Sequence, residues 1–177
     1  MQFLERKDID KIVKVFGTSK PLDLRDAALF EVLFSTGMRI SEALALPDAP
    51  FSGNKEKGTL ELSIVGKGDY RRTVYFSPRT LKSVRAWLDV REDRGTKLFP
   101  MTVRMAQYVV KRRASDAGYE GVHPHMLRHS FGTYILGKTG NIRLCQELLG
   151  HRAISSTMLY THVTSKELKE AHGSLFK

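Results

Sequence analysis

Cysteine and long apolar runs are the two features that this sequence most clearly lacks. The single thiol, Cys145, cannot form an internal disulfide, and its helical surroundings, IRLCQELLG, predict that it fills space in the core. No apolar run approaches the roughly 20 residues that cross a bilayer. The amino-terminal MQFLERKDID lacks the apolar stretch of a signal peptide. These absences favour a protein of a reducing, intracellular compartment with no membrane partner.

Internal repeats, low-complexity segments and linkers rich in proline or glycine are missing as well. A chain of 177 residues is long enough for one domain with a proper core and short for two. We therefore expect one compact unit.

Acidic residues are in deficit: 29 Lys and Arg stand against 19 Asp and Glu, giving a formal net charge of +10 and a pI near 9.8. Such an excess favours a polyanionic partner, of which nucleic acid is the commonest. The basic residues are dispersed along the chain, which suits a face that follows a phosphate backbone better than a basic tail would. On charge alone, a basic protein without such a partner remains the alternative.

Hydrophobic periodicity predicts a mostly α-helical fold with a small β-hairpin insert, an α+β arrangement. Leu60, Leu62 and Ile64 alternate with polar residues and are followed by GKGD and YRRTVYF, which predicts a hairpin with Lys67 at its tip. Helical spacing predicts helices over 6–16, 22–37, 40–46, 77–90, 103–118, 124–140, 141–150, 155–163 and 164–173.

Cap signals sharpen several of these helices. Residues 22–37 are apolar on nearly every side, as expected of a central buried helix, and Gly37 is a natural left-handed stop. Ser77 and Asn141 are predicted N-caps, and Thr164 with Glu167 forms a predicted capping box.

The stretch HPHMLRHSFGTYIL contains the first candidate site. His125 and Arg128 are three residues apart, so on a helix they share a neighbouring face and can both donate hydrogen bonds to one phosphate. Gly132, one turn on, costs a helix about 1 kcal/mol against Ala, which indicates that something approaches it closely. An incidental solvated face is the alternative. Zinc binding by His125 and His129, with His123 nearby, is weaker because no catalytic glutamate adjoins and an arginine lies between them.

A second candidate lies in STGMRISEALAL. Arg39 follows a glycine stop and begins a helix, where backbone N–H groups favour an anion. Glu42, one turn on, is expected either to hold this guanidinium in place or to form a surface ion pair of little energetic value.

Together with the hairpin lysine in VGKGDYRRTVYF and the stretch LLGHRAISSTMLYTHV, these motifs resemble the tyrosine site-specific recombinases, or phage integrase family. The four stretches occur in the family's order and span about residues 34–163. The resemblance implies a metal-independent enzyme that needs no cofactor. It breaks and rejoins DNA through a 3′-phosphotyrosine link. The catalytic set that it implies here is Arg39, Lys67, His125, Arg128, His151 and Tyr160, with Glu42 in support.

The resemblance also implies a role for each residue. Tyr160 is the nucleophile rather than a core tyrosine, and His125 is the base that assists its deprotonation. Two arginines clamp the non-bridging oxygens. Lys67 is the general acid for the 5′-oxygen, with Lys55 or Lys57 as alternatives because the hairpin varies in length. His151 hydrogen-bonds the phosphate.

Partners and organisation follow from the same resemblance. Residues 1–177 are expected to form a single catalytic domain, without the family's N-terminal core-binding (SAM-like) domain. Double-stranded DNA is the expected partner, on which recombinase subunits assemble as a tetramer, while the chain alone is a monomer. A prokaryotic or phage protein of the cytoplasm, associated with the nucleoid, is expected. Residues 164–177 either dock into a neighbouring subunit or fold back on their own core.

Two alternative functions remain. A type IB-like DNA topoisomerase uses a nearly identical residue set to relax DNA without exchanging partners. A catalytically inactive DNA-binding module would keep the fold and lose the chemistry.

Overall fold

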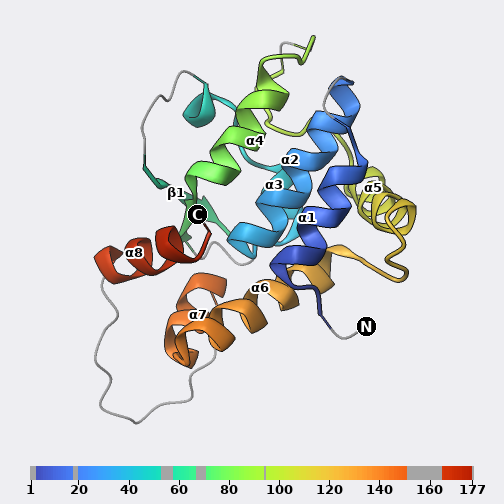
Figure 1. Cartoon of the computed structure of the whole chain (residues 1–177). Helices are drawn as coiled ribbons and strands as arrows, with labels where there is room; N and C mark the ends of the chain where they lie inside the picture. Colours follow the sequence, from blue (N-terminus) through green and yellow to red (C-terminus); the bar gives the residue numbers. More distant parts are fainter. Residues whose placement is uncertain are drawn as a thin grey trace.

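The computed structural model describes residues 3–17, 20–52, 58–66, 71–93, 95–150 and 165–176. Within these ranges it has eight α-helices, one short 3-10 helix and a two-stranded sheet, which confirms the predicted mostly helical fold with a hairpin insert (Figure 1). The elements are α1 (Arg6–Val15), α2 (Pro21–Thr36), α3 (Ile40–Leu44), η1 (Ala49–Phe51), β1 (Leu60–Val65), β2 (Arg71–Phe76), α4 (Pro78–Leu88), α5 (Val103–Asp116), α6 (Pro124–Thr139), α7 (Ile142–Leu149) and α8 (Ser165–Leu175).

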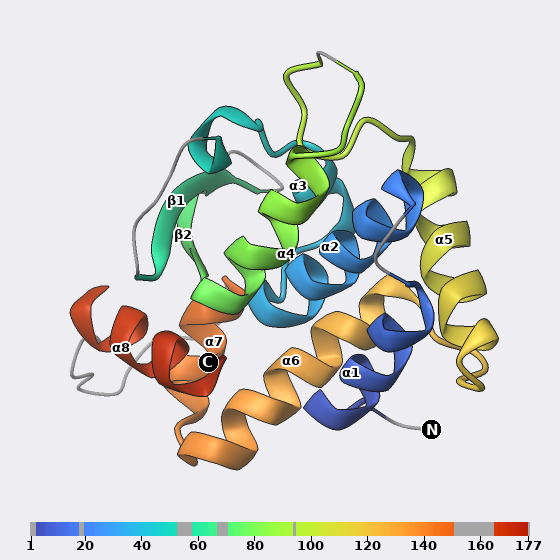
Figure 2. The same cartoon turned by 45° about the horizontal axis from the view of Figure 1, so that its top comes forward.

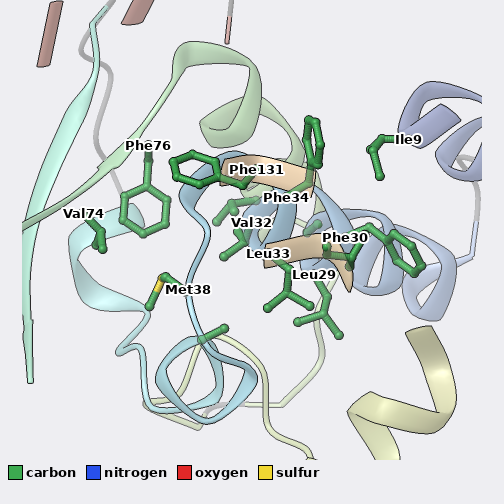
Figure 3. Packing of buried hydrophobic residues seen from close by; sticks show 14 of the residues in the cluster. Ile9, Leu29, Phe30, Val32, Leu33, Phe34, Met38, Val74, Phe76 and Phe131 are labelled. Carbon is green, nitrogen blue, oxygen red and sulfur yellow. The ribbon is translucent and has the colours of Figure 1, made fainter. Parts of the chain in front are cut away.

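Helix α2 is the centre of the fold. Every residue from Asp26 to Thr36 is buried, as the apolar character of this segment predicts. The helix contacts α1, α3, α4, α5, α6 and β2, which surround it in Figures 1 and 2. Figure 3 shows Phe30 and Phe34 of α2 within the apolar cluster to which Phe131 of α6 and Phe76 of β2 also belong. Burial of these rings is the main stabilising term of the domain.

The predicted caps at the ends of three helices are confirmed. Ser77 accepts a hydrogen bond from the backbone N–H of Thr80 at 3.3 Å, and Asn141 accepts one from Leu144 at 3.0 Å. Gly37 ends α2 with a φ of 60°, a left-handed conformation that glycine adopts without steric cost.

Helix α3 is shorter than predicted. It ends at Leu44 rather than continuing to residue 46, because the following residues pair elsewhere. Leu46 accepts a hydrogen bond from the backbone N–H of Leu98 at 2.8 Å, and Pro47 forms an isolated bridge with Lys97. A residue before proline also disfavours the helical region, which stops α3 early.

The hairpin strands pair antiparallel from Leu60 opposite Phe76 to Val65 opposite Arg71. Ile64 is the buried residue of β1, in line with the predicted alternation. In β2 the exposed Arg71 is followed by Arg72, which is buried although it is charged. The tip of the hairpin, at 67–70, lies outside the described residues.

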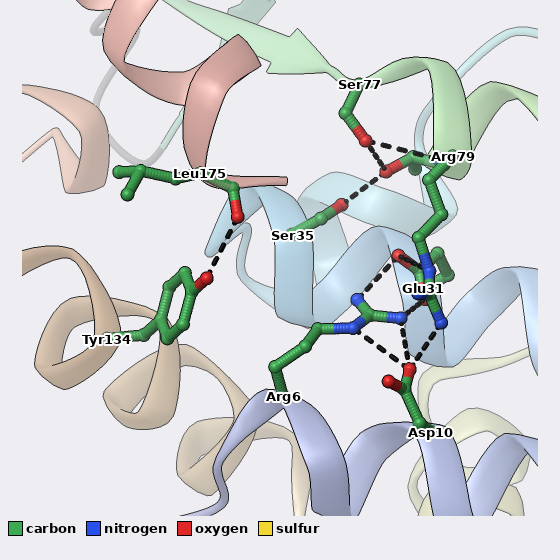
Figure 4. Close-up of polar contacts among 9 residues, drawn as sticks. Arg6, Asp10, Glu31, Ser35, Ser77, Arg79, Tyr134 and Leu175 are labelled. Atoms are coloured by element: carbon green, nitrogen blue, oxygen red, sulfur yellow. Dashed lines mark hydrogen bonds and ion pairs between the residues drawn. The ribbon is translucent and has the colours of Figure 1, made fainter. Parts of the chain in front are cut away.

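Buried polar groups fix α2 against α1 and α4 (Figure 4). Arg6 donates two hydrogen bonds of 2.7 Å to the carboxylate of Glu31, a bidentate ion pair across α1 and α2. Ser35 Oγ lies 2.8 Å from the hydroxyl of Thr80, which in turn contacts Ser77 at the start of α4. These contacts set the position of the carboxyl end of α2, from which the chain enters the candidate site.

Helix α8 folds back on its own chain. Phe176, just after it, is 1% exposed and stacks on Phe131 with ring centroids 5.6 Å apart. Tyr134 donates a hydrogen bond to the carbonyl of Leu175 at 2.9 Å, as Figure 4 shows. The alternative in which this helix packs on its own core is therefore the arrangement found here.

Two local predictions, the helix over 155–163 and the capping box at Thr164, fall outside the described residues. Among the helices that the structure describes, none has the length and apolar character that crossing a membrane requires.

The buried imidazole of His172 makes the docking of α8 sensitive to pH. Its Nε2 donates to the carbonyl of Ser35 at 2.6 Å, while Nδ1 has no partner among the described residues. Burial lowers the pKa of His172 from 6.5 to about 4. The folded form therefore holds this ring neutral while the released helix takes up a proton, so stability falls as pH drops from about 6.5 to 4.

We expect acid over this window to cost about 3 kcal/mol of α8 docking, one pKa unit being worth about 1.4 kcal/mol. Hydrogen exchange of the α8 amides at a series of pH values measures this cost. His172→Gln keeps a donor toward Ser35 and cannot titrate, so the docking free energy of α8 in this variant should depend less on pH. The same slope of docking free energy against pH in both proteins would refute the assignment.

Candidate functional site

A pocket of about 430 Å³ opens between the start of α3, one face of α5 and the start of α6. Arg39 and Arg128, which are 89 residues apart in the sequence, both line it. The pocket is lined by Met38, Arg39, Ile40, Ser41, Gln107, Lys111, His123, Pro124, His125 and Arg128. None of these lining residues is acidic. The structure thus brings together three members of the implied catalytic set, Arg39, His125 and Arg128.

Arg128 is the buried floor of this pocket, with the residue 8% exposed. Its Nη1 donates to the carbonyl of Gly37 at the end of α2, and its Nη2 donates to that of Leu149 at the end of α7, at 2.7 Å. The guanidinium plane is therefore fixed from two sides by backbone groups. Because carbonyls satisfy hydrogen bonds without neutralising charge, the cation stays available to an anion in the pocket.

Arg39 is held by the carboxylate of Glu42. It is the N-cap of α3, and its backbone N–H and Nη1 donate to the two oxygens of Glu42 at 2.8 and 3.0 Å. The side chain of Glu42 is 5% exposed, whereas that of Arg39 is 39% exposed. The pair is therefore not a surface ion pair: a buried carboxylate orients a guanidinium that reaches the pocket.

Arg72 is a third arginine at this site, and sequence reasoning missed its role. Its Nη2 donates to Glu42 at 2.7 Å and its Nη1 to the carbonyl of Leu148 at 3.1 Å. The alternation of β2 was the available signal, because it places a charged residue on the strand's buried face. Lys111 of α5 also lines the pocket and was not singled out from the sequence.

Three arginines and one carboxylate give this site a surplus of positive charge. Burial, together with the nearby charges of Arg39 and Arg72, lowers the pKa of Arg128 to about 10 against the opposing effect of Glu42. Burial alone would raise the pKa of Glu42, but the backbone N–H of Arg39 and the charge of Arg72 outweigh it, so this pKa is lowered. A cluster with these shifts is stabilised by an incoming anion.

The amino end of α6 adds to the same potential. His123 is its N-cap, and His123, Pro124 and His125 line the pocket at the end where the helix dipole is positive. Among the described residues, no group of three or more His, Cys, Asp or Glu side chains could hold a metal ion. His125 is exposed and lines the pocket.

Two glycines allow the elements that hold Arg128 to approach one another. A Cβ on Gly132 would lie 3.2 Å from Leu149 and 3.5 Å from Cys145. The segment expected to approach this interior glycine closely is therefore α7. A Cβ on Gly37 would lie 2.5 Å from the ring of Phe131. Cys145 is buried, as predicted.

The remaining predicted site residues lie outside the described ranges: Lys67, His151 and Tyr160, together with the alternative lysines Lys55 and Lys57. Their placement, and the catalytic role of every residue named, stay predictions.

Comparison with known proteins connects this geometry to one family. Residues 2–167 match the sequence model of the phage integrase family. The tyrosine recombinase XerD of Corynebacterium glutamicum is 38% identical over 162 residues, covering 85% of this chain and 52% of the relative. XerC of the same organism is 32% identical over 176 residues, covering 94% and 56%.

Solved structures agree with these relatives. The XerH site-specific recombinase bound to palindromic difH substrate, a post-cleavage complex, matches with a TM-score of 0.71 and 29% identity. That match covers 86% of this chain and 47% of XerH. The chain therefore spans about half the length of the relatives it matches.

Gly37→Ala should destabilise the protein by at least about 2 kcal/mol, because it forces alanine into a left-handed conformation and against Phe131. Gly137→Ala is the matched control: its Cβ would meet nothing within 4 Å in the exposed part of α6, and it should stabilise by about 0.5–1 kcal/mol. Urea unfolding of both variants measures the difference. Equal effects would show that the packing at Gly37 is not required.

Proposed function

Because the chain belongs to the phage integrase family, we propose that it is the catalytic part of a site-specific DNA recombinase. The reaction is metal-independent cleavage and rejoining of DNA strands through a 3′-phosphotyrosine intermediate. The observation that carries this proposal is the convergence of Arg39 and Arg128, from distant parts of the sequence, on one pocket with surplus positive charge.

The two arginines suit a phosphodiester in its transition state. Arg128 is immobilised on two carbonyls and Arg39 on a carboxylate, so neither guanidinium needs to reorganise when charge grows on the non-bridging oxygens. Preorganised donors of this kind lower the barrier most, because their ordering cost is met during folding. The positive end of α6 acts in the same direction.

Bond making and breaking are assigned through the family resemblance. Tyr160 and Lys67 lie outside the described residues, and His125 lines the pocket. The phenolic oxygen of Tyr160 attacks the phosphorus and forms the phosphotyrosine bond, while the bond to the 5′-oxygen breaks. Tyr160 loses its proton with the help of His125, and Lys67 supplies a proton to the departing 5′-oxygen. The link preserves the phosphodiester's energy, so a second 5′-hydroxyl can reverse the reaction onto a new strand.

Double-stranded DNA is the proposed substrate, and other recombinase subunits are the proposed partners, assembled as a tetramer on it. XerH is described in complex with its difH substrate both before and after cleavage. The net charge of +10 supports a DNA partner for this chain. We place the protein in the cytoplasm of a prokaryote, associated with the nucleoid.

The alternatives in which the chain is a type IB-like topoisomerase or an inactive binding module are not favoured. Its relatives are named tyrosine recombinases, and all the residues of the implied catalytic set are present.

Covalent capture tests the proposed chemistry. The chain is incubated with a library of nicked duplexes whose central sequence is randomised, and DNA that remains attached in SDS and EDTA is recovered and sequenced. We expect a defined sequence to be captured, because a lost 5′ fragment prevents religation, and we expect no capture by Tyr160→Phe.

Tyr108→Phe is the matched control, since this exposed tyrosine of α5 lies outside the pocket. It should capture the same DNA as the wild type. If Tyr160→Phe still captures DNA, Tyr160 is not the nucleophile. Absence of any wild-type adduct would favour the binding module. In a separate assay on supercoiled plasmid carrying the captured sequence, relaxed circles with no exchanged junctions would favour the topoisomerase.

Binding of this chain alone to duplex DNA should be weak and steeply dependent on salt. Each phosphate neutralised by Lys or Arg contributes a slope of about −0.9 to log K against log salt. Arg39→Gln should reduce that slope by about one, because a half-exposed guanidinium that meets a phosphate is removed. Fluorescence anisotropy with a labelled duplex measures the affinity and its salt slope for the wild type and for Arg39→Gln. Nanomolar binding of the wild type at physiological salt would contradict the expected weak binding.

A further inference from the structure

Arg72 of β2 is buried where it meets α3 and the end of α7. Its side chain is 4% exposed, although a guanidinium is among the most costly groups to remove from water. It reaches from β2 to Glu42 of α3 at 2.7 Å and to the carbonyl of Leu148 in the last turn of α7 at 3.1 Å. Such burial is tolerated only where each partner is well placed.

The chain after α7 is shaped around this side chain. Gly150 has a φ of 67°, and a Cβ there would clash with Cδ of Arg72. A glycine in a left-handed conformation thus lets the backbone pass directly over the arginine's aliphatic stem. Arg72 therefore fixes the end of α7 through packing as well as through the hydrogen bond to Leu148.

The same helix end also holds Arg128. Arg72 binds the carbonyl of Leu148 and Arg128 binds that of the next residue, Leu149. Both cations lie at the carboxyl end of α7, where unpaired carbonyls and the helix dipole favour positive charge. A shift of the end of α7 would therefore displace the carbonyl of Leu149, which accepts a hydrogen bond from Arg128.

Glu42 connects Arg72 to the other arginine. One of its oxygens, Oε2, accepts from both Arg72 and the backbone N–H of Arg39, and the other, Oε1, accepts from the Arg39 side chain. The carboxylate is therefore shared, and Arg72 determines which way it faces. Without this partner, the carboxylate is free to turn toward Arg39 and Arg128 and compete with a phosphate for them.

We propose that Arg72 is a positioning residue of the recombination reaction, which holds Arg39 through Glu42 and Arg128 through the end of α7. It does not line the pocket, so it acts through these two residues and not on the phosphate. The inference rests on the proposed function for its catalytic consequence. An arginine is required because one planar group donates in two directions, toward a carboxylate and a carbonyl, which a lysine ammonium matches poorly.

Arg72→Met tests this role, and Arg71→Met is its matched control. Both variants remove one positive charge from adjacent residues of β2, but Arg71 is exposed whereas Arg72 is buried. Single-turnover adduct formation is measured at saturating concentration of the duplex captured by the wild type. We expect the rate to fall about 10²-fold in Arg72→Met, the effect of displacing reacting groups by roughly 1 Å, and to stay near the wild-type rate in Arg71→Met.

A second readout is independent of cleavage. Titration of the Glu42 carboxyl, followed by carbon-13 NMR, should show a pKa higher in Arg72→Met than in the wild type, since one of the two cations that hold it ionised is gone. Arg71→Met should titrate as the wild type does. Where the wild type cleaves, the acid limb of the pH–rate profile of Arg72→Met should move to higher pH by as much as the pKa of this carboxyl does.

The outcomes separate the two proposals. If the wild type forms no adduct, the proposed function fails, while the Glu42 titration still decides whether Arg72 holds that carboxylate. If the wild type cleaves and Arg72→Met cleaves at the rate of Arg71→Met, the positioning role is wrong. An unchanged Glu42 titration in Arg72→Met would also overturn it.

Discussion

The buried guanidinium of Arg128 is the constraint on which the site depends. It is tied to the carbonyls of Gly37 and Leu149, so the ends of α2 and α7 must meet over the start of α6. A charge in this position is costly unless its hydrogen bonds are satisfied, and here carbonyls satisfy them without cancelling the charge. The electrostatic potential in the pocket therefore stays positive, and a bound anion would be stabilised by it.

The distribution of carboxylates determines how much of that potential remains. Among the described residues, the other two buried acids pair with arginines outside the pocket: Asp26 with Arg113, and Glu31 with Arg6, as Figure 4 shows. At the site itself, Glu42 serves both Arg39 and Arg72, which leaves a net positive cluster. A second carboxylate there would hold the arginines equally well but would remove the attraction for a phosphate.

Local signals predicted much of the fold. The buried character of α2, the caps at Ser77 and Asn141 and the left-handed Gly37 all depend on neighbours in the sequence, and each was found. The length of α3 was predicted wrongly, because Leu46 and Pro47 pair with residues some 50 positions later. Long-range pairing of this kind has no local signature.

For the candidate site, too, some features could be predicted from the sequence and others depended on the tertiary structure. By itself, the sequence determined that Arg39, His125 and Arg128 are the residues to examine, since their motifs occur in a recognisable order, and it determined that the protein is strongly basic. Only the tertiary structure decided that Arg39 and Arg128 share a pocket and that Glu42 is buried between Arg39 and Arg72. The reason is physical: motif spacing follows the chain, whereas burial and charge balance depend on which distant segments fold against one another.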